Sequence, residues 1–477
     1  MASRAVRDAL LVAYGVRTRQ GPALADEFVY LAGARALVTA HTLDARYYDA
    51  DAILRAGHPH HDVHAPGYVL VLAAAALLMG PGNAAAVALN VAAYVAAALL
   101  VYALARGLEV EAPRARLAAL LALVLPGALP YVYWAMAETV LGALVLGALV
   151  LAARAEERPW PAAAAGAVLG MAMLVRESAL FLLPALVLLL RGRARRAAAF
   201  AFVAFLLLVY APLARHRAPG GANFWAPSSG RAFGYAAVQA MGAGRLATAA
   251  ALAAHRAATN LAELVSPSTT WTERGVLAAF VVLPALALAR WRAHSPRGRR
   301  YLVGLLAGYV AIAALLFGVY VVAQWSGWRY AVVLIPAFLP LVVPRGRARW
   351  PVMAVLAVAS LVLLAGMRQV FNAYKASRQK RQAGIAGYVE RYVPQAPERL
   401  VLPNGWLYGW RHPSTEVIST LPSDAAALRA LERSVAFSVL VVPADSPLRA
   451  DTEGRLRYER VNTDDRDPPL VIFRRLR

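Results

Sequence analysis

The chain has 477 residues, 60% of them hydrophobic, a mean hydropathy of +0.51 and no cysteine. The apolar content exceeds the roughly 45–50% typical of soluble domains, and the lack of cysteine excludes disulfides, a thiol nucleophile and Cys-ligated metals in this chain. The net charge of +23 does not indicate nucleic-acid binding, because the basic residues separate apolar blocks instead of gathering on one soluble face.

The N-terminal part is expected to form an outer loop with juxtamembrane helices over about residues 20–83. An amphipathic run follows Asp26 and Glu27, and the apolar block 67–79 is shorter than the about 17–25 residues that span a bilayer. We therefore expect an interfacial or re-entrant helix there. A span should precede this loop, but residues 9–16 are too short to form one, so we expect either a truncated first helix or an unusual N-terminus.

Ten to eleven membrane spans are expected between this loop and residue 367. Apolar blocks place ten of them at about 84–105, 115–135, 139–153, 161–175, 178–190, 197–213, 275–290, 301–322, 330–344 and 350–366. Alternate connections are rich in arginine, namely 106–116, 154–158, 191–196, 290–300 and 345–349. The short connections of the other set carry only Arg176 and Arg329. The positive-inside rule places the arginine-rich set in the cytoplasm.

The C-terminal part, residues 368–477, changes character, because long apolar blocks disappear and charges of both signs appear. Segments 399–403, 416–420 and 439–443 are predicted strands, and 424–434 is a predicted helix with Asp424 as a possible N-cap. The fold class that follows is a mostly α transmembrane bundle with a small, extracytoplasmic α/β domain. The whole is expected to be a multi-pass protein of the plasma (inner) membrane.

Acidic residues at membrane boundaries are the first candidates for chemistry. Carboxylates are costly near hydrocarbon and are often functional there. Asp26, Glu27 and Glu138 are all expected on the outer side, where one carboxylate can accept a proton from an acceptor hydroxyl or amine. The alternative is a helix N-cap for Asp26 and a solvated loop or helix cap for Glu138.

A histidine-rich segment, HPHHDVH, lies just before block 67–79. Imidazoles at this spacing can bind a divalent metal ion. The alternative, which we favour, is a polar loop without metal. His64, beside the predicted interfacial helix, is the best candidate among them to contact a substrate.

Several short motifs, in order along the chain, resemble the GT-C superfamily of polytopic membrane glycosyltransferases, in particular its protein O-mannosyltransferase and aminoarabinose transferase branch. The motifs are the acidic pair in ADEFVY, the segment HAPGYVLVLAAAALLMG at 64–80, VYALARGL at 101–108, Glu138, LVRESALFLLPALVLLL at 174–190 and Arg329-Tyr330 through Pro336. An outer soluble domain completes the likeness, which covers most of the chain.

This resemblance implies transfer of a sugar from a polyprenyl-phosphate donor to a lipid, glycan or protein acceptor, with inversion. It implies Asp26 as the general base, supported by Glu27, and Glu138 in the same cavity. Arg176 and Arg329, with Tyr330, would bind the donor phosphate, since a guanidinium matches phosphate oxygens. Tyr30 and His64 would contact substrate. The alternatives for the two arginines are a pair with Glu177 and cation–π packing among Trp325, Trp328 and Tyr330.

Three other functions are weighed against this one: a transporter or flippase of a lipid-linked saccharide, an oligosaccharide ligase, and a non-catalytic scaffold. A transporter usually has paired repeats and acidic residues near mid-membrane, and the sequence has neither. A scaffold would leave Asp26, Glu138 and Arg329 without a shared task. The sequence does not separate a ligase from a monosaccharide transferase.

Overall fold

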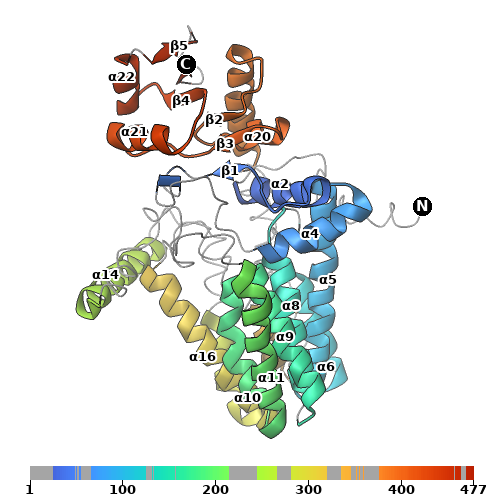
Figure 1. The fold of residues 1–477 in the computed structure, drawn as a ribbon. Coiled ribbons are helices and arrows are strands. Elements are labelled where there is room, and N and C mark those ends of the chain that lie inside the picture. The colour runs from blue at the N-terminus through green and yellow to red at the C-terminus, as the bar shows by residue number, and fades with distance from the viewer. Residues whose placement is uncertain are drawn as a thin grey trace.

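The computed structural model describes residues 25–48, 50, 53–54, 66–124, 132, 134–155, 157–213, 244–265, 281–319, 335–344, 351, 354, 358, 375–455, 457–462 and 469–476. A bundle of apolar helices carries a small sheet domain at one end (Figure 1). This is the predicted class, a polytopic transmembrane helical bundle with an α/β domain. The predicted domain boundary at 367–368, the short segment 9–16 and the connection 323–329 lie outside the described residues.

The bundle is built from antiparallel helices joined by short connections. Its described members are α5 (Asn83–Gly107), α6 (Ala112–Val124), α8 (Glu138–Ala155), α9 (Pro159–Val175), α10 (Leu183–Leu189), α11 (Gly192–Phe205), α16 (Pro296–Val319) and α18 (Ile335–Val342). Close packing relies on small residues, as is usual between membrane helices. Gly166 of α9 meets the backbone of Ala198, and Gly304 of α16 meets that of Ala185.

Three described helices are long and apolar enough to cross a bilayer: Asn83–Gly107, Glu138–Ala155 and Gly192–Leu213. Pro66–Met79, Pro159–Val175 and Glu177–Leu189 are apolar but shorter. The first of these, α4 (Pro66–Met79), coincides with the block predicted to lie at the interface. The predicted span 178–190 is not one regular helix. It is a 3-10 segment, η1 (Glu177–Leu182), followed by α10, with Pro184 at the junction.

The arginine-rich connections gather at one end of the bundle. The turns after α5, α8 and α10 and the turn before α16 all lie at the end away from the sheet (Figure 1). The fifth such connection, 345–349, lies outside the described residues. The connections at residues 136–138 and 176–177 lie at the opposite end, beneath the sheet domain. The alternation expected from the sequence is therefore an alternation between two ends of the folded bundle.

The sheet has six strands in the order β1-β3-β2-β4-β6-β5. They are β1 (Tyr47–Tyr48), β2 (Arg399–Val401), β3 (Glu416–Ile418), β4 (Val439–Pro443), β5 (Tyr458–Arg460) and β6 (Leu470–Arg475). The first four positions pair in parallel, and β6 runs antiparallel to β4 and β5. The strands predicted at 399–403, 416–420 and 439–443 are confirmed. The edge strand β1 comes from the N-terminal loop. The sequence predicted this loop but not a strand within it.

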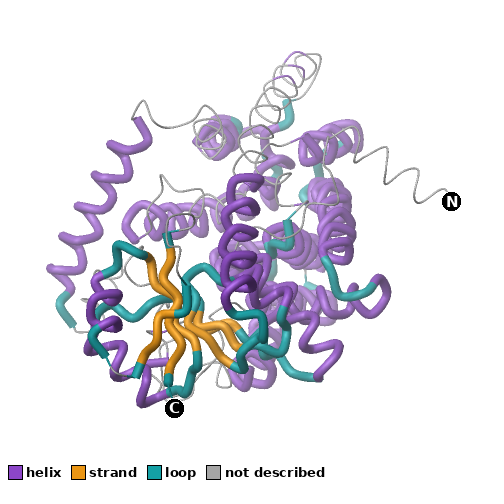
Figure 2. Tube along the Cα trace, turned by 90° about the horizontal axis from the view of Figure 1, so that it is seen from above, coloured by secondary structure: helices purple, strands orange, loops and turns teal. Residues whose placement is uncertain are grey.

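The sheet is covered on both faces. Successive side chains of a strand point to opposite faces, so Val439 and Val441 lie in one core while Leu440 and Val442 lie in the other. The helix over residues 375–392 and the short helix α20 (Trp406–Arg411) cover the first face, and α21 (Ala425–Ser434) and α22 (Pro447–Glu453) cover the second. Seen from the sheet end, the strands lie over the bundle helices (Figure 2).

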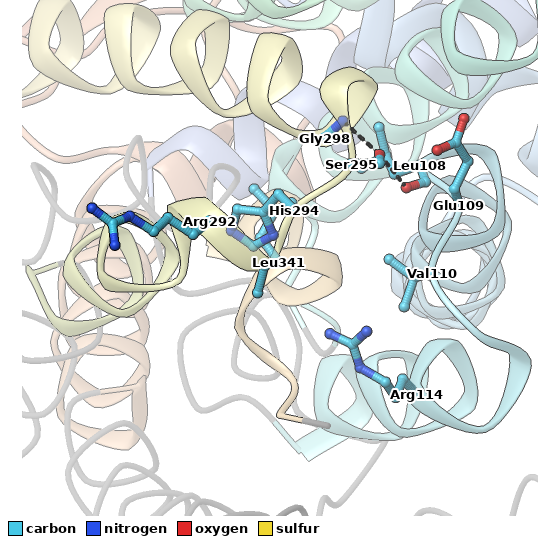
Figure 3. Close-up of a pocket in the computed structure, with 10 residues that line it drawn as sticks. Leu108, Glu109, Val110, Arg114, Arg292, His294, Ser295, Gly298 and Leu341 are labelled. Atoms are coloured by element: carbon cyan, nitrogen blue, oxygen red, sulfur yellow. Dashed lines mark hydrogen bonds between the residues drawn. The ribbon is translucent and has the colours of Figure 1, made fainter. Parts of the chain in front are cut away.

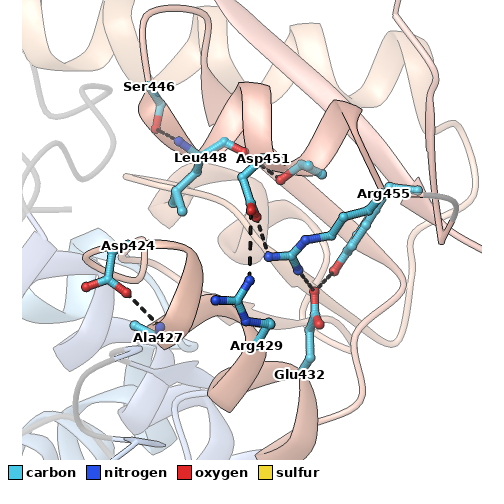
Figure 4. Close-up of polar contacts among 10 residues, drawn as sticks. Asp424, Ala427, Arg429, Glu432, Ser446, Leu448, Asp451 and Arg455 are labelled. Atoms are coloured by element: carbon cyan, nitrogen blue, oxygen red, sulfur yellow. Dashed lines mark hydrogen bonds and ion pairs between the residues drawn. The ribbon is translucent and has the colours of Figure 1, made fainter.

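Polar contacts fix the second layer of the sheet domain. Asp424 is the N-cap of α21 and accepts a hydrogen bond from the backbone N–H of Ala427 at 2.8 Å, as predicted. Arg455 pairs with Asp451 of α22 and with Glu432 of α21 at 3.0 Å (Figure 4). Tyr458 of β5 donates a hydrogen bond to Glu432 at 2.6 Å. The two helices and the edge strand are thus tied together.

Helix α2 (Ala25–Ala40) joins the two parts of the molecule. It lies across the end of the bundle, beneath the sheet domain (Figure 1). Phe28 and Val29 belong to the core under the sheet, whereas Tyr30 and Leu31 belong to the core of the bundle. Because α2 packs into both cores, the residues on its first turn are held between the membrane helices and the sheet domain.

Candidate active site

Residues 134–138 form the connection that leads into α8, and side chains from several segments of the chain contact it. Glu27 of α2 is fully buried and accepts a hydrogen bond from the backbone N–H of Ala135, with 3.2 Å between nitrogen and Oε1. The same oxygen lies 3.3 Å from Nζ of Lys375, the first described residue of the helix over 375–392. The ammonium group also lies 5.9 Å from the centre of the Trp134 ring. Glu27 is therefore a buried carboxylate paired with a buried cation.

A buried amide holds the same connection from below. Asn90 of α5 donates hydrogen bonds through Nδ2 to the carbonyl oxygens of Trp134 at 2.6 Å and Met136 at 3.2 Å. Its Oδ1 accepts a hydrogen bond from the hydroxyl of Tyr68 at 3.2 Å. Tyr30 packs edge to face on Tyr68, with 4.8 Å between ring centres. An unpaired polar group would be costly at this depth, so Asn90 fixes the connection firmly.

Glu138 and Arg176 form a second buried ion pair at the same end of the bundle. Glu138 is the first residue of α8, where the helix dipole favours a negative charge. Arg176 lies in extended backbone between α9 and η1. Arg176 thus has Glu138 as a partner, a pairing that the sequence did not predict. The side chain of Glu138 is 2% exposed and that of Arg176 is 11% exposed.

A close backbone contact fixes the position of Arg176. A Cβ atom on Gly67 of α4 would lie 2.5 Å from the carbonyl carbon of Leu174, so only glycine permits the observed approach. Because Leu174 is two residues before Arg176, α4 holds the C-terminal end of α9 in place. The segment Pro66–Met79 thereby acts as a brace beneath the site.

The remaining predicted residues have different positions. Asp26 lies beside Glu27 on the first turn of α2 and is half-buried. Tyr30 is 4% exposed and belongs to the bundle core. His64, Arg329 and Tyr330 lie outside the described residues, as do the other histidines of HPHHDVH. Among the described residues, no group of three or more histidine, aspartate and glutamate side chains could hold a metal ion.

Two residues at this site were not expected from the sequence. Lys375 is one of only two lysines in a chain whose other basic residues are arginine, and that rarity was its only signal. Asn90 is a polar residue within a long apolar helix, a pattern that often marks a structural or functional site in membranes.

Together, two carboxylates and two cations converge on one connection beneath the sheet domain. No protein-family model and no curated protein sequence matches this chain. Structural comparison, however, finds clear likenesses. ArnT from Cupriavidus metallidurans bound to undecaprenyl phosphate matches with a TM-score of 0.63 at 12% identity, over 98% of this chain and 97% of that chain.

This chain has the GT-C fold. ArnT from the same organism in the apo state matches with a TM-score of 0.59 at 13% identity, over 98% and 96% of the two chains. The Archaeoglobus fulgidus oligosaccharyltransferase tethered with an acceptor peptide matches with a TM-score of 0.54 at 13% identity. That match covers 90% of this chain but 66% of the oligosaccharyltransferase. The GT-C fold therefore extends over nearly the whole chain, its sheet domain included.

Proposed function

We propose that this protein transfers a sugar from a polyprenyl-phosphate donor to an acceptor on the extracytoplasmic face of the membrane. The observation that carries the proposal is the convergence of the Glu27–Lys375 and Glu138–Arg176 pairs at one end of a GT-C fold. The structural neighbours add support, because the ArnT structure holds undecaprenyl phosphate and the oligosaccharyltransferase structure holds an acceptor peptide. The end of the bundle that carries few arginines would face outward.

In the proposed reaction, the acceptor oxygen or nitrogen attacks the anomeric carbon of the sugar. The bond from that carbon to the phosphate oxygen breaks, and the lipid phosphate leaves as a dianion. Attack opposite the leaving group inverts the anomeric configuration. Asp26 takes the acceptor proton as general base, a role worth about 10²–10⁴-fold in rate.

The proposed roles of the neighbouring residues follow from their surroundings. Glu27 holds the backbone of residue 135 and supports Asp26 on the same helical turn. Arg176 and Arg329 neutralise the leaving phosphate, with Tyr330 beside them, and Glu138 lines the same cavity and orients Arg176. His64 contacts the substrate. Tyr30, although buried against Tyr68, is proposed to shape the wall nearest the substrate.

A whole-oligosaccharide ligase is the second candidate, because the oligosaccharyltransferase shares the fold. The extent of the matches favours the single-sugar transferase. This chain covers 97% of ArnT but 66% of the oligosaccharyltransferase.

The test is transfer of radiolabelled sugar from synthetic polyprenyl-phosphate donors by the purified protein in detergent, with the anomeric configuration of the product determined by NMR. We expect slow transfer or donor hydrolysis with inversion. Donor binding without any cleavage would instead favour a transporter or scaffold, and retention of configuration would contradict the single-displacement mechanism.

A further inference from the structure

A cavity lies at the far end of the bundle, away from the Glu27 and Glu138 pairs. Its volume is about 410 Å³, and its walls are the turn between α5 and α6 and the turn before α16, with Leu341 of α18 (Figure 3). Cavities of about 300–1,000 Å³ are typical of small-ligand sites. Along α5 the backbone rises about 25 Å between Asn90 and Gly107, so this cavity is distinct from the site described above.

The side chain of Ser295 joins the two walls. Ser295 accepts a hydrogen bond from the backbone N–H of Gly298 at 3.1 Å and donates one to the carbonyl oxygen of Leu108 at 3.3 Å. The first bond caps the N-terminal turn of α16, and the second ties this turn to the end of α5. These two hydrogen bonds therefore hold the backbone of the two walls in place relative to each other.

The charges around the cavity are mainly positive. Arg114 is 5% exposed and donates two hydrogen bonds to the carbonyl oxygen of Val343, at 3.2 and 2.7 Å. The N-terminal end of α16, a helix of 24 residues, contributes a partial positive charge. Arg292 lies at the rim with its guanidinium directed away from Arg114, and it is exposed (Figure 3). Within the described residues it makes no hydrogen bond or ion pair.

Only one carboxylate lies among the described lining residues. The side chain of Glu109 is 56% exposed and lies 3.9 Å from Arg297, a distance at which an exposed pair contributes little. The backbone of Glu109 has a φ of 66°, a left-handed conformation that favours glycine or asparagine. The cavity thus combines guanidinium groups and a helix N-terminus with one weakly paired acid, which is the environment that binds phosphate groups.

We propose that this cavity binds the phosphate group of an anionic phospholipid in the leaflet opposite the candidate active site. Its place supports a lipid source, because basic pockets between membrane helices are suited to anionic head groups. The arginine-rich connections surround this end of the bundle, so the electrostatic field there favours anionic lipids (Figure 1). Arg292 would turn from the rim onto the phosphate, while Arg114 forms the inner wall. The proposal does not depend on the proposed activity.

The test uses the purified, delipidated protein in neutral detergent. Phosphatidylglycerol, phosphatidylcholine or inorganic phosphate is added, and affinity is obtained from the concentration dependence of Tm. We expect phosphatidylglycerol to raise Tm and phosphatidylcholine to leave it unchanged. Arg292→Ala should weaken phosphatidylglycerol binding about tenfold, since a hydrogen-bonded ion pair is lost. The matched control is Arg193→Ala, an exposed arginine at the same end, at the start of α11.

A variant with the opposite expected effect protects the test from a folding defect. Glu109→Asn removes the negative charge and suits the left-handed backbone, so it should tighten phosphatidylglycerol binding about two- to fivefold. Equal shifts with both lipids in the wild type would overturn the proposal, as would unchanged affinities in both variants. A shift from inorganic phosphate as large as that from phosphatidylglycerol would contradict the lipid source and assign the cavity to a soluble phosphate compound.

Discussion

Two buried carboxylates at one end of the bundle are each paired with a cation from another segment of the chain. Glu27 of α2 pairs with Lys375, and Glu138 of α8 pairs with Arg176. Burial of an unpaired charge is expensive, whereas a paired and hydrogen-bonded one persists. The two pairs therefore position the connection at residues 134–138, and the half-buried Asp26, the proposed general base, lies on the same turn as Glu27.

The Glu27–Lys375 pair can be tested by a double-mutant cycle. Lys375→Met should lower the free energy of unfolding by about 3–5 kcal/mol, because it leaves a buried carboxylate unpaired. Glu27→Gln should also destabilise the protein. The double variant should recover much of the loss, and the coupling energy measured by reversible denaturation in detergent should exceed about 1 kcal/mol. Additive effects would show that the two groups do not interact.

Arg176 is expected to act through its planar guanidinium. Arg176→Lys keeps the charge near Glu138 but removes the bidentate geometry that matches phosphate oxygens. The affinity for a polyprenyl-phosphate donor should therefore fall about tenfold, with little change in Tm. Arg193→Lys serves as the control, because Arg193 lies at the start of α11, at the end of the bundle away from the candidate site. Unchanged donor affinity in Arg176→Lys would remove this residue from the phosphate site.

At the residue scale, the sequence predicts part of the site. Rare acids at helix boundaries pointed to Glu27 and Glu138 as candidates, because charged groups are costly there, and the structure places each of them in a buried ion pair. The partner of Glu27 could not be predicted, since Lys375 is 348 residues away and only the fold brings the two together. Local sequence patterns show which residues are unusual at their positions. They do not show which residues far apart in the sequence come into contact in the fold.

Helix α4 and the end of α9 form the tightest contact beneath the site. Gly67→Ala places a methyl group 2.5 Å from the backbone of Leu174, so α4 must shift. We expect a loss of about 1–3 kcal/mol in stability and weaker donor binding, both measured in detergent.

Gly142→Ala in α8 is the matched control, because a Cβ there meets nothing within 4 Å. It should be neutral or stabilise the helix by up to about 1 kcal/mol. If Gly67→Ala were as well tolerated as Gly142→Ala, the claim that the close contact between α4 and α9 supports the site would be wrong.

At the element scale, apolar blocks predicted the described helices well, because burial in lipid and in the bundle core requires long apolar runs. The break after α9 was predicted at residues 176–177, but the irregular start of the next span was not. There the chain forms the 3-10 turn Glu177–Leu182, and packing against α16 decides the backbone conformation. The two-residue strand β1 was missed for a similar reason, since so short a strand has no periodicity to detect.

The whole molecule depends on α2 and β1, which connect the membrane bundle to the sheet domain. Tyr47 of β1 is buried and donates a hydrogen bond to the carbonyl oxygen of Trp406 at 2.7 Å. Burial raises the pKa of the Tyr47 hydroxyl well above its usual value, so the group stays a neutral donor at physiological pH. The position of the sheet over the site follows from these contacts.

Tyr47→Phe tests this connection. The variant leaves the carbonyl oxygen of Trp406 buried without its donor, which should cost about 1–3 kcal/mol. The loss should appear as a lower Tm of the full-length protein. Tyr392→Phe, which removes a hydroxyl without a hydrogen-bond partner in the described part of the chain, should change Tm little. Equal Tm values for the two variants would argue against a supporting role for β1.

At the scale of the molecule, composition and arginine spacing predicted a helical bundle with a small α/β domain, and this is confirmed. Hydropathy determines which segments enter the membrane. It carries no information about the long-range pairing that adds β1 to the sheet or inserts α2 between two cores.

The central claim is that a carboxylate on the first turn of α2 serves as the base for sugar transfer. The most direct test compares wild type, Asp26→Asn and Asp445→Asn, an exposed aspartate in a turn of the sheet domain, in binding and transfer from the same polyprenyl-phosphate donor. We predict that Asp26→Asn binds donor normally but transfers sugar about 10²–10⁴-fold more slowly, while Asp445→Asn matches wild type. Full activity of Asp26→Asn would contradict the assignment and move the search for the base to Glu138.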